Sequence, residues 1–303
     1  MEPVTACHQQ AYACAEAVVI DAAVTRPGLT SFSRPRSDLD PLAFAALAPR
    51  AYEACLCSCL RSTAKDHTGW LGCWLDAIES LTAAEWGNPG MGMLFLLSLQ
   101  AAALGYTVEK LGSDDDMHVM GAAQLLVEQA GVEGAKAFYR ALQLVAPSYL
   151  GRLSWNGLPD ATTGRLALAE LWEKQVTLRE LLAAASLYDP VARDAATGFS
   201  LSFGEIIPLL LEHADDLATG VRRATYYIAG FHGDFLLRRK RGGFLGELWR
   251  RAYMGDQAAE EELYRLLEGA AGPGSSADVV ANAVARLLYL AEAGRITVRL
   301  YPP

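Results

Sequence analysis

Residues 91–105 read MGMLFLLSLQAAALG and form the longest apolar run of the chain. The run is interrupted by the polar side chain of Gln100 and is only about fifteen residues long, whereas a helix that crosses a bilayer needs roughly 20 apolar residues. We therefore predict a buried helix here and expect no membrane-spanning segment.

The segments on both sides of this run are also helical in pattern. Alanine and leucine dominate them, and apolar side chains recur every three or four residues, which indicates amphipathic or buried helices. The expected helices cover residues 5–24, 39–63, 69–83, 90–104, 114–129, 132–146, 162–186, 188–196, 199–218, 220–231, 234–253, 256–269 and 275–293. Only the tail Arg295–Tyr301 alternates like a strand, and it could simply be extended.

The pattern predicts an all-α fold, a multi-helix globular bundle of about 12–13 helices without a substantial sheet. A chain of 303 residues that is 52% hydrophobic can build one large core or two fused helical subdomains. We expect a single domain over residues 1–303. The loop Asn156–Asp160, which contains a glycine and a proline, could divide it into halves of about 1–155 and 160–303.

Charge and missing motifs narrow the classes of function. The formal net charge of −9 argues against nucleic-acid binding, because phosphate neutralisation needs an excess of Lys and Arg. Residues 1–10 carry no secretory signal pattern, so the cytoplasm is the expected location. The chain has no Walker-type GxxxxGK[ST] loop, no GxSxG elbow and no HExxH motif.

The six cysteines are interpreted as reduced thiols, because disulfide frameworks are typical of short secreted chains. Cys55, Cys57 and Cys59 alternate and do not have the paired spacing of a zinc site.

A run of three aspartates, Asp114–Asp116, follows Ser113. We favour Ser113 as a helix N-cap followed by an acidic first turn, which the helix dipole stabilises. A magnesium site is the alternative, although consecutive residues of a helix cannot all face one ion.

Four glycine-bearing or polar stretches interrupt the helices, and each has a plain structural interpretation. Asp21–Gly28 is a helix stop. Gly87–Gly92 is a tight turn, or a phosphate cradle at the start of the next helix. Asp234–Gly243 contains the dense basic run at 238–241, which is a solvated surface or a phosphate clamp. Gly272–Asp278 is an ordinary helix cap.

Taken in order, these stretches resemble the triphosphoribosyl-dephospho-CoA synthase family. Asp21–Gly28 is similar to the family's E-V-S-x-P-K-P-G, and Asn88–Gly92 to its N-T-x-x-G. Asp234–Gly242 resembles D-T-x-I-x-R-K-x-G, and Pro273–Asp278 resembles P-G-T-T-A-D. Weaker similarities cover residues 132–151 and 188–199.

The resemblance implies a transferase that moves a triphosphoribosyl unit from ATP to a ribose hydroxyl of dephospho-CoA and expels adenine. It implies carboxylates at Asp21, Asp189, Asp234 and Asp278, of which Asp21 and Asp234 would hold Mg²⁺. It also implies donor-binding groups at Arg26, Asn88, Gly90, Gly92, Arg239, Lys240, Ser275 and Ser276. The donor would be ATP or phosphoribosyl pyrophosphate.

Several departures from the family pattern leave alternatives open. Pro89 and Phe235 each replace a threonine, and so they remove hydroxyls that could bind phosphate or magnesium. The acceptor could instead be a pterin-type one-carbon cofactor intermediate, or the chain could be a non-catalytic helical binding or assembly protein. We expect small-molecule partners and no membrane partner, and a homodimer is compatible with the sequence.

Overall fold

A computed structural model describes residues 2–37, 39–146, 157–233, 244–269 and 272–302. Within these ranges the chain is all-α, as predicted, and contains no strand beyond two isolated bridges in residues 31–39. The N-terminal helices are α1 (Pro3–Ala23), α2 (Leu42–Thr63), α3 (Trp70–Ala83), α4 (Met91–Leu111), α5 (Asp116–Gln129) and α6 (Gly131–Val145). The later helices are α7 (Arg165–Glu173), α8 (Leu178–Ala185), α9 (Pro190–Ala196), α10 (Ile207–Leu211), α11 (Leu217–Tyr227), α13 (Phe244–Tyr253), α14 (Gln257–Leu266) and α15 (Gly274–Glu292).

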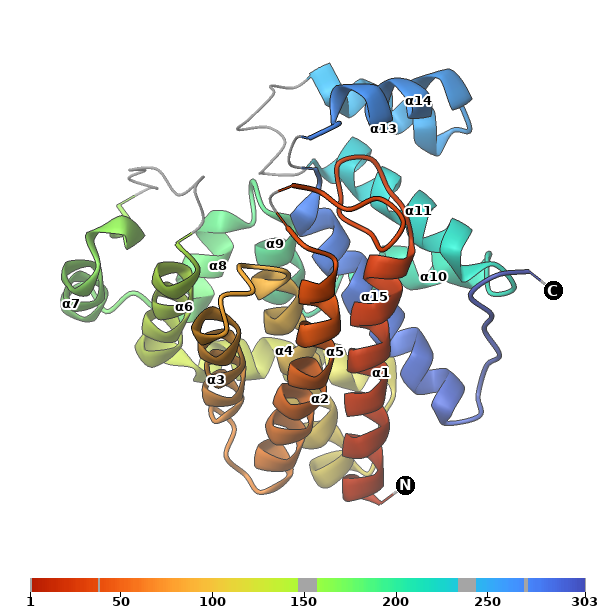
Figure 1. Cartoon of the computed structure of the whole chain (residues 1–303). Coiled ribbons are helices and arrows are strands. Elements are labelled where there is room, and N and C mark those ends of the chain that lie inside the picture. The colour runs from red at the N-terminus through yellow and green to blue at the C-terminus, as the bar shows by residue number, and fades with distance from the viewer. Residues whose placement is uncertain (1, 38, 147–156, 234–243, 270–271, 303) are drawn as a thin grey trace.

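Helix α4 is the central element of the core, and it contacts α1, α2, α3, α5, α9 and α15 (Figure 1). It extends six residues beyond the apolar run, to Leu111, so by length and composition it could cross a membrane. However, 89% of its most apolar window is buried inside the protein, as in the core helix of a soluble fold.

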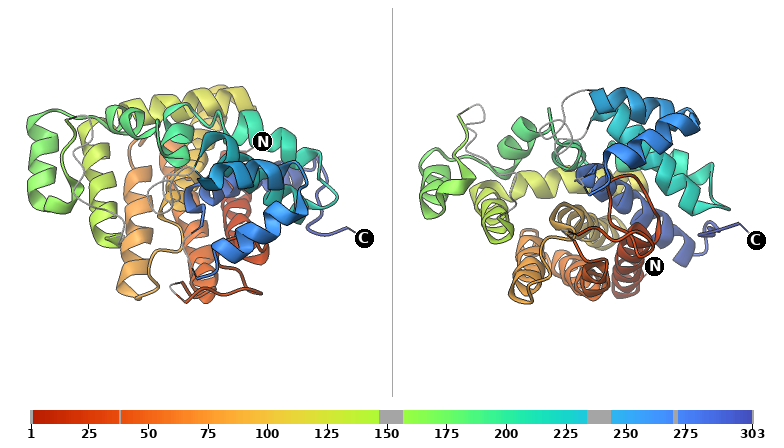
Figure 2. Two further views of the ribbon diagram at one scale, coloured as in Figure 1. Left: turned by 90° about the horizontal axis from the view of Figure 1, so that it is seen from above. Right: turned by 45° about the horizontal axis from the view of Figure 1, so that its top comes forward.

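The C-terminal helices α13 and α14 pack on each other and on α11, at one end of the molecule (Figures 1 and 2). They form a small second core around Tyr226, Trp249 and Leu263. Trp249 and Leu263 are fully buried there.

The expected helix at 162–186 is wrong in one respect, because it is divided into α7 and α8. Gln175 adopts a positive φ of 53°, which ends α7. Thr177 then starts α8 with a capping box, in which its hydroxyl accepts from the Glu180 N–H and the Glu180 carboxylate accepts from the Thr177 N–H.

The strand-like tail forms neither a helix nor a strand, and it is hydrogen-bonded to a helix start. The carbonyl oxygens of Arg299 and Leu300 accept from the N–H groups of Leu217 and Ala218, both at 2.9 Å. These bonds satisfy two of the N–H groups that the first turn of α11 leaves without a helical partner.

The prediction that all six cysteines are reduced is wrong. Helix α2 lies between α1 and α3, and it carries Cys57 and Cys59 on different faces. Cys59 is bonded to Cys7 of α1, and Cys57 is bonded to Cys73 of α3, with Cα–Cα distances of 5.4 and 5.9 Å.

The aspartate run caps α5, but its N-cap is Asp115 and not Ser113. The Asp115 carboxylate accepts from the Met117 N–H at 2.9 Å. The other two aspartates pair with arginines: Asp116 accepts from the buried Arg286 at 2.7 Å, and Asp114 from Arg295 at 2.6 Å. This arrangement is an ion-pair network that joins the start of α5 to α15 and the tail.

Candidate active site

The start of α15 is held against the loop that follows α1. A Cβ atom on Gly28 would lie 2.7 Å from the Cα of Gly272, and Gly28 has a positive φ of 72°. Only glycine fits such an approach of two backbones. The first and fourth stretches predicted from the sequence therefore meet in the structure, directly before the α15 residues Ser275, Ser276 and Asp278.

The first turn of α4 lies against Asp278. A Cβ atom on Gly92 would lie 2.4 Å from Oδ2 of Asp278, so this glycine leaves the space that the carboxylate occupies. The N-cap of α4 is Gly90, and two residues before it Oδ1 of Asn88 accepts from the N–H of Met91, the first residue of the helix, at 2.9 Å. Gly90 between them is extended, with a φ of 175°.

The start of α9 completes this arrangement. Asp189 is the N-cap of α9 and accepts from the Val191 N–H at 2.9 Å and from the hydroxyl of Ser275. Burial raises the pKa of the Asp189 carboxyl, and these hydrogen bonds oppose the rise. Val191 also lies close to Gly92, because a Cβ atom there would be 3.2 Å from its Cγ2.

Three helices, α4, α9 and α15, thus begin at one place, and each of them contacts the other two. Helix N-termini present unpaired N–H groups and a partial positive charge, which favour anions. Two carboxylates, Asp189 and Asp278, lie among them. This combination suits a phosphorylated ligand that is bound together with a cation.

A chain of buried polar side chains fixes these helices relative to one another. Gln10 on α1 donates to Gln100 on α4 at 2.6 Å, and Gln100 donates to Oδ1 of Asn282 on α15 at 3.0 Å. Asn282 donates to Ser202 at 3.0 Å and lies 3.4 Å from Oδ2 of Asp194 on α9. Burial raises the pKa of Asp194 to about 6, against the hydrogen bonds that it accepts.

Asp21 and Arg26 form a buried ion pair. The Nη2 atom of Arg26 donates to Oδ1 and to the backbone oxygen of Asp21, both at 2.6 Å, and Nη1 donates to Thr225 at 3.3 Å. Burial raises the pKa of Asp21, and Arg26 opposes the rise. The guanidinium is fully buried, so it holds the first loop in place and does not face solvent.

The predicted residues Asp234, Arg239 and Lys240 lie outside the described part of the chain, as does the basic run at 238–241. The preceding residues are described up to Gly233. One of them, His232, belongs to a polar cluster that could not be recognised from the sequence.

Glu205, Tyr227, His232 and Arg193 form this cluster. Oε2 of Glu205 accepts from the Tyr227 hydroxyl at 2.7 Å and lies 2.8 Å from Nε2 of His232. Nη1 of Arg193 lies 3.1 Å from Nδ1 of the same imidazole. Because arginine can only donate, we assign the hydrogen to Nε2, so that His232 accepts from Arg193 and donates to Glu205.

The cluster borders the candidate site, since Arg193 follows Asp189 by one turn of α9. Glu205 and His232 lie on two π-helical turns, Ser202–Ile206 and Ile228–His232, and such turns are frequent at functional sites. The only feature of the sequence that could have indicated this cluster is the position of His232, two residues before Asp234. The pairing of Glu205 with His232, 27 positions apart, depends on the fold.

Within the described ranges, no three His, Cys, Asp or Glu side chains are grouped to hold a metal ion. Mg²⁺, however, is usually bound by one or two carboxylates together with substrate phosphates and water. The Asp278 carboxylate, beside three helix starts, is compatible with this mode of binding.

Comparison with known proteins identifies the family to which the chain belongs. The sequence profile described as CitG, ATP:dephospho-CoA triphosphoribosyl transferase, matches residues 7–296. The chain therefore belongs to this family of transferases.

A crystal structure from Archaeoglobus fulgidus, of a protein proposed to be a triphosphoribosyl-dephospho-CoA synthase, has the same fold. It is 20% identical, with a TM-score of 0.58, and the match covers 80% of this chain and 98% of that one. A search among curated proteins gives no match.

Proposed function

We propose that this protein transfers the triphosphoribosyl unit of ATP to a ribose hydroxyl of dephospho-CoA. The observation that supports this most is the meeting of three helix starts with the carboxylates of Asp189 and Asp278. The residues at the α4 and α15 starts are also those through which the chain resembles its family. Asn88, Gly90, Gly92, Ser275 and Ser276 all lie at these two starts.

In the proposed reaction, the acceptor oxygen forms a bond to C1′ of the ATP ribose while the bond from C1′ to adenine breaks. Adenine leaves with the electron pair of that bond, and the proton of the hydroxyl goes to a base. Asp189 is our candidate for this base, because burial raises its pKa and a more basic carboxylate is a better proton acceptor. The positive charge that develops at C1′ would be stabilised by Asp278.

We propose that the triphosphate binds at the starts of α4 and α15, with Arg193 as a cationic ligand. Arg193 is exposed and is oriented by His232, which Glu205 holds in turn. Arg26 keeps an indirect role, since it is paired with Asp21. Arg239 and Lys240 remain phosphate ligands by resemblance.

Magnesium would neutralise the phosphate oxygens. We propose Asp278 and Asp234 as its protein ligands, and Asp21, which is paired with Arg26, as a further ligand.

We also propose a cytoplasmic location, where ATP is available. Disulfides are rare in that compartment, so the location is tested directly by cell fractionation. The protein should be recovered with cytoplasmic marker proteins, and its recovery outside the cytoplasm would contradict the proposal.

The proposed activity is tested with purified protein, Mg²⁺, ATP and dephospho-CoA, by measuring adenine release and the mass of the product. Parallel reactions replace ATP by phosphoribosyl pyrophosphate, or dephospho-CoA by a pterin-type acceptor. Adenine formed only with dephospho-CoA supports the proposal. Turnover only with another acceptor would contradict dephospho-CoA as the acceptor while keeping the transferase reaction. The absence of both turnover and nucleotide binding would contradict the proposal and favour a binding or assembly protein.

A further inference from the structure

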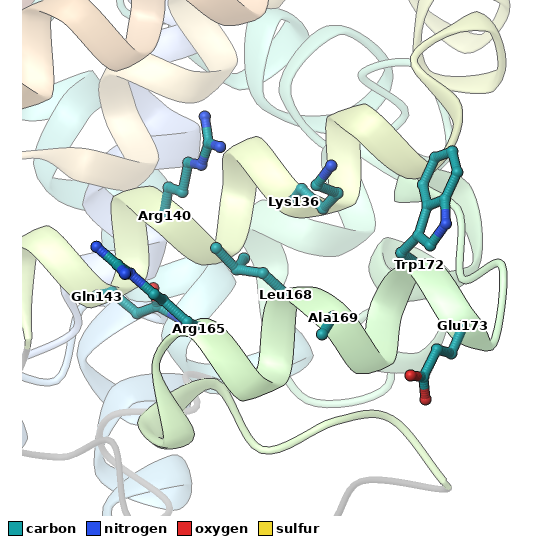
Figure 3. Close-up of a pocket in the computed structure, with 8 residues that line it drawn as sticks. All are labelled: Lys136, Arg140, Gln143, Arg165, Leu168, Ala169, Trp172 and Glu173. Atoms are coloured by element: carbon teal, nitrogen blue, oxygen red, sulfur yellow. The ribbon is translucent and has the colours of Figure 1, made fainter.

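A groove with a volume of about 610 Å³ opens to solvent between α6 and α7 and is lined by none of the candidate active-site residues (Figure 3). Helix α7 is the outermost helix on this side in all views (Figures 1 and 2). None of the residues that line the groove was singled out in the sequence as a site residue. Its volume is within the range of small-molecule sites, roughly 300–1,000 Å³.

One end of the groove is cationic. Arg140 on α6 and Arg165, the first residue of α7, are both exposed. In the part of the chain that the structure describes, neither guanidinium has a carboxylate partner. Between them, Gln143 donates to the carbonyl oxygens of Ala161 and Gly164, at 3.1 and 3.0 Å, and so fixes the turn from which α7 starts.

The other end of the groove is aromatic. Trp172 is 55% exposed, which is unusual for so large an apolar side chain. The Nζ atom of Lys136 lies over its ring, 5.3 Å from the centroid, and also pairs with Glu133 at 2.8 Å. Figure 3 shows the side chains of Lys136, Arg140 and Trp172 projecting to the same side, whereas Glu173 points the other way.

The groove therefore has a positive local charge in a chain whose net charge is −9. Two exposed guanidinium groups that have no carboxylate partner among the described residues contribute nothing to the core, whereas each of them can bind a phosphate bidentately. The seven positions from Arg165 to Trp172 span about 10 Å along α7, which is comparable to the length of a nucleotide from its phosphate to its base.

We propose that this groove is a second ligand site, which binds a nucleoside monophosphate with its phosphate on Arg140 and Arg165 and its base on Trp172. The apolar side chain of Leu168 lies between the two ends and would contact the sugar. The proposal does not depend on the proposed transferase reaction, because the two sites share no residue.

Calorimetric titration with AMP, ribose 5-phosphate and adenosine tests the proposal. Arg140→Gln and Arg165→Gln should each weaken AMP binding about tenfold, the usual loss for a hydrogen bond to a charged group. Trp172→Ala should weaken binding of AMP but not of ribose 5-phosphate, and Trp172→Phe should largely restore it. Arg179→Gln removes another exposed arginine, from α8 outside the groove, and serves as the control.

The variant Asp278→Asn distinguishes AMP binding in the groove from AMP binding in the active site. AMP binding in the groove should persist in Asp278→Asn and be lost in the double variant Arg140→Gln/Arg165→Gln. Unchanged AMP affinity in the double variant, with thermal stability equal to that of the wild type, would overturn the proposal. So would the absence of AMP binding to the wild-type protein, or equal affinity for AMP and ribose 5-phosphate.

Discussion

Arg26 donates to both the side chain and the backbone of Asp21, at 2.6 Å each, and the two side chains are 0% and 7% exposed. A buried charge without a partner is costly, so Asp21→Asn should destabilise the protein by about 3–5 kcal/mol. Urea denaturation measures the loss. Glu262→Gln, which breaks an exposed pair with Arg265 at 2.5 Å, should leave the midpoint nearly unchanged. Equal effects of the two substitutions would contradict the assignment of a buried pair.

The two disulfides should stabilise the protein through the unfolded state. The bond from Cys7 to Cys59 joins residues 52 positions apart, and closing a loop of this size contributes between about 3 and 5 kcal/mol in the chain-entropy model. Cys7→Ser/Cys59→Ser should therefore lower the melting temperature clearly, and Cys14→Ser, at a free buried cysteine, is the comparison. If dithiothreitol at denaturing temperature has no effect on the wild-type melting curve, the disulfides are absent.

Asp194 should make stability depend on pH. Its folded pKa of about 6 is above the ordinary value of 3.8, so the folded state holds this proton more tightly than the unfolded state does. The contribution is fully present below pH 4 and is lost as the pH rises to about 6, with a size of about 3 kcal/mol. Asp194→Asn should flatten this part of the curve of unfolding free energy against pH. Superimposable curves for variant and wild type would contradict the pKa shift.

Arg193 should act on donor binding. Arg193→Gln removes the proposed phosphate ligand and should raise KM for ATP about tenfold or more, with a smaller change in kcat. His232→Asn should give a smaller rise in KM, because it loosens the arginine without removing its charge. Arg179→Gln is the control for a lost surface charge. A fall in kcat alone, at unchanged KM, would argue against this role.

Composition and periodicity together predicted the helical fold, because amphipathic helices such as α6 repeat their apolar positions within a short window and α4 is a continuous apolar run. The predicted helix boundaries were wrong where the conformation of a single residue ends a helix. Gln175 is left-handed, and it divides a continuous apolar pattern into α7 and α8. The cysteine pairs were missed because Cys7 and Cys59 meet only through the packing of α1 on α2.

The candidate site was predicted in part. Residues at helix starts, such as Asp189, Gly92 and Asp278, could be identified from short motifs, and the fold brings them together. That they bind a ligand remains a prediction. Arg193 and Glu205 carry no motif, because their roles depend on contacts with His232 across the fold. Arg26 has a structural role because its side chain is buried and paired with Asp21, and burial cannot be read from the sequence of a loop.

The central contact of the proposed active site is the one between Gly92 and Asp278. Gly92→Ala would place a methyl group 2.4 Å from Oδ2 of Asp278. This oxygen is at the end of the aspartate side chain, which can rotate away from the methyl group. The fold should therefore survive while the carboxylate moves away. Gly121→Ala is the matched control, since that helical glycine has open space around it and alanine there should stabilise the protein by roughly 0.5–1 kcal/mol.

The most direct measurement is therefore the rate of adenine release from ATP and dephospho-CoA by the wild type, Gly92→Ala, Asp278→Asn and Gly121→Ala. We predict that the wild type and Gly121→Ala release adenine at similar rates, and that both site variants are slowed about 100-fold or more while remaining folded. Wild-type rates in Asp278→Asn would contradict the proposed site.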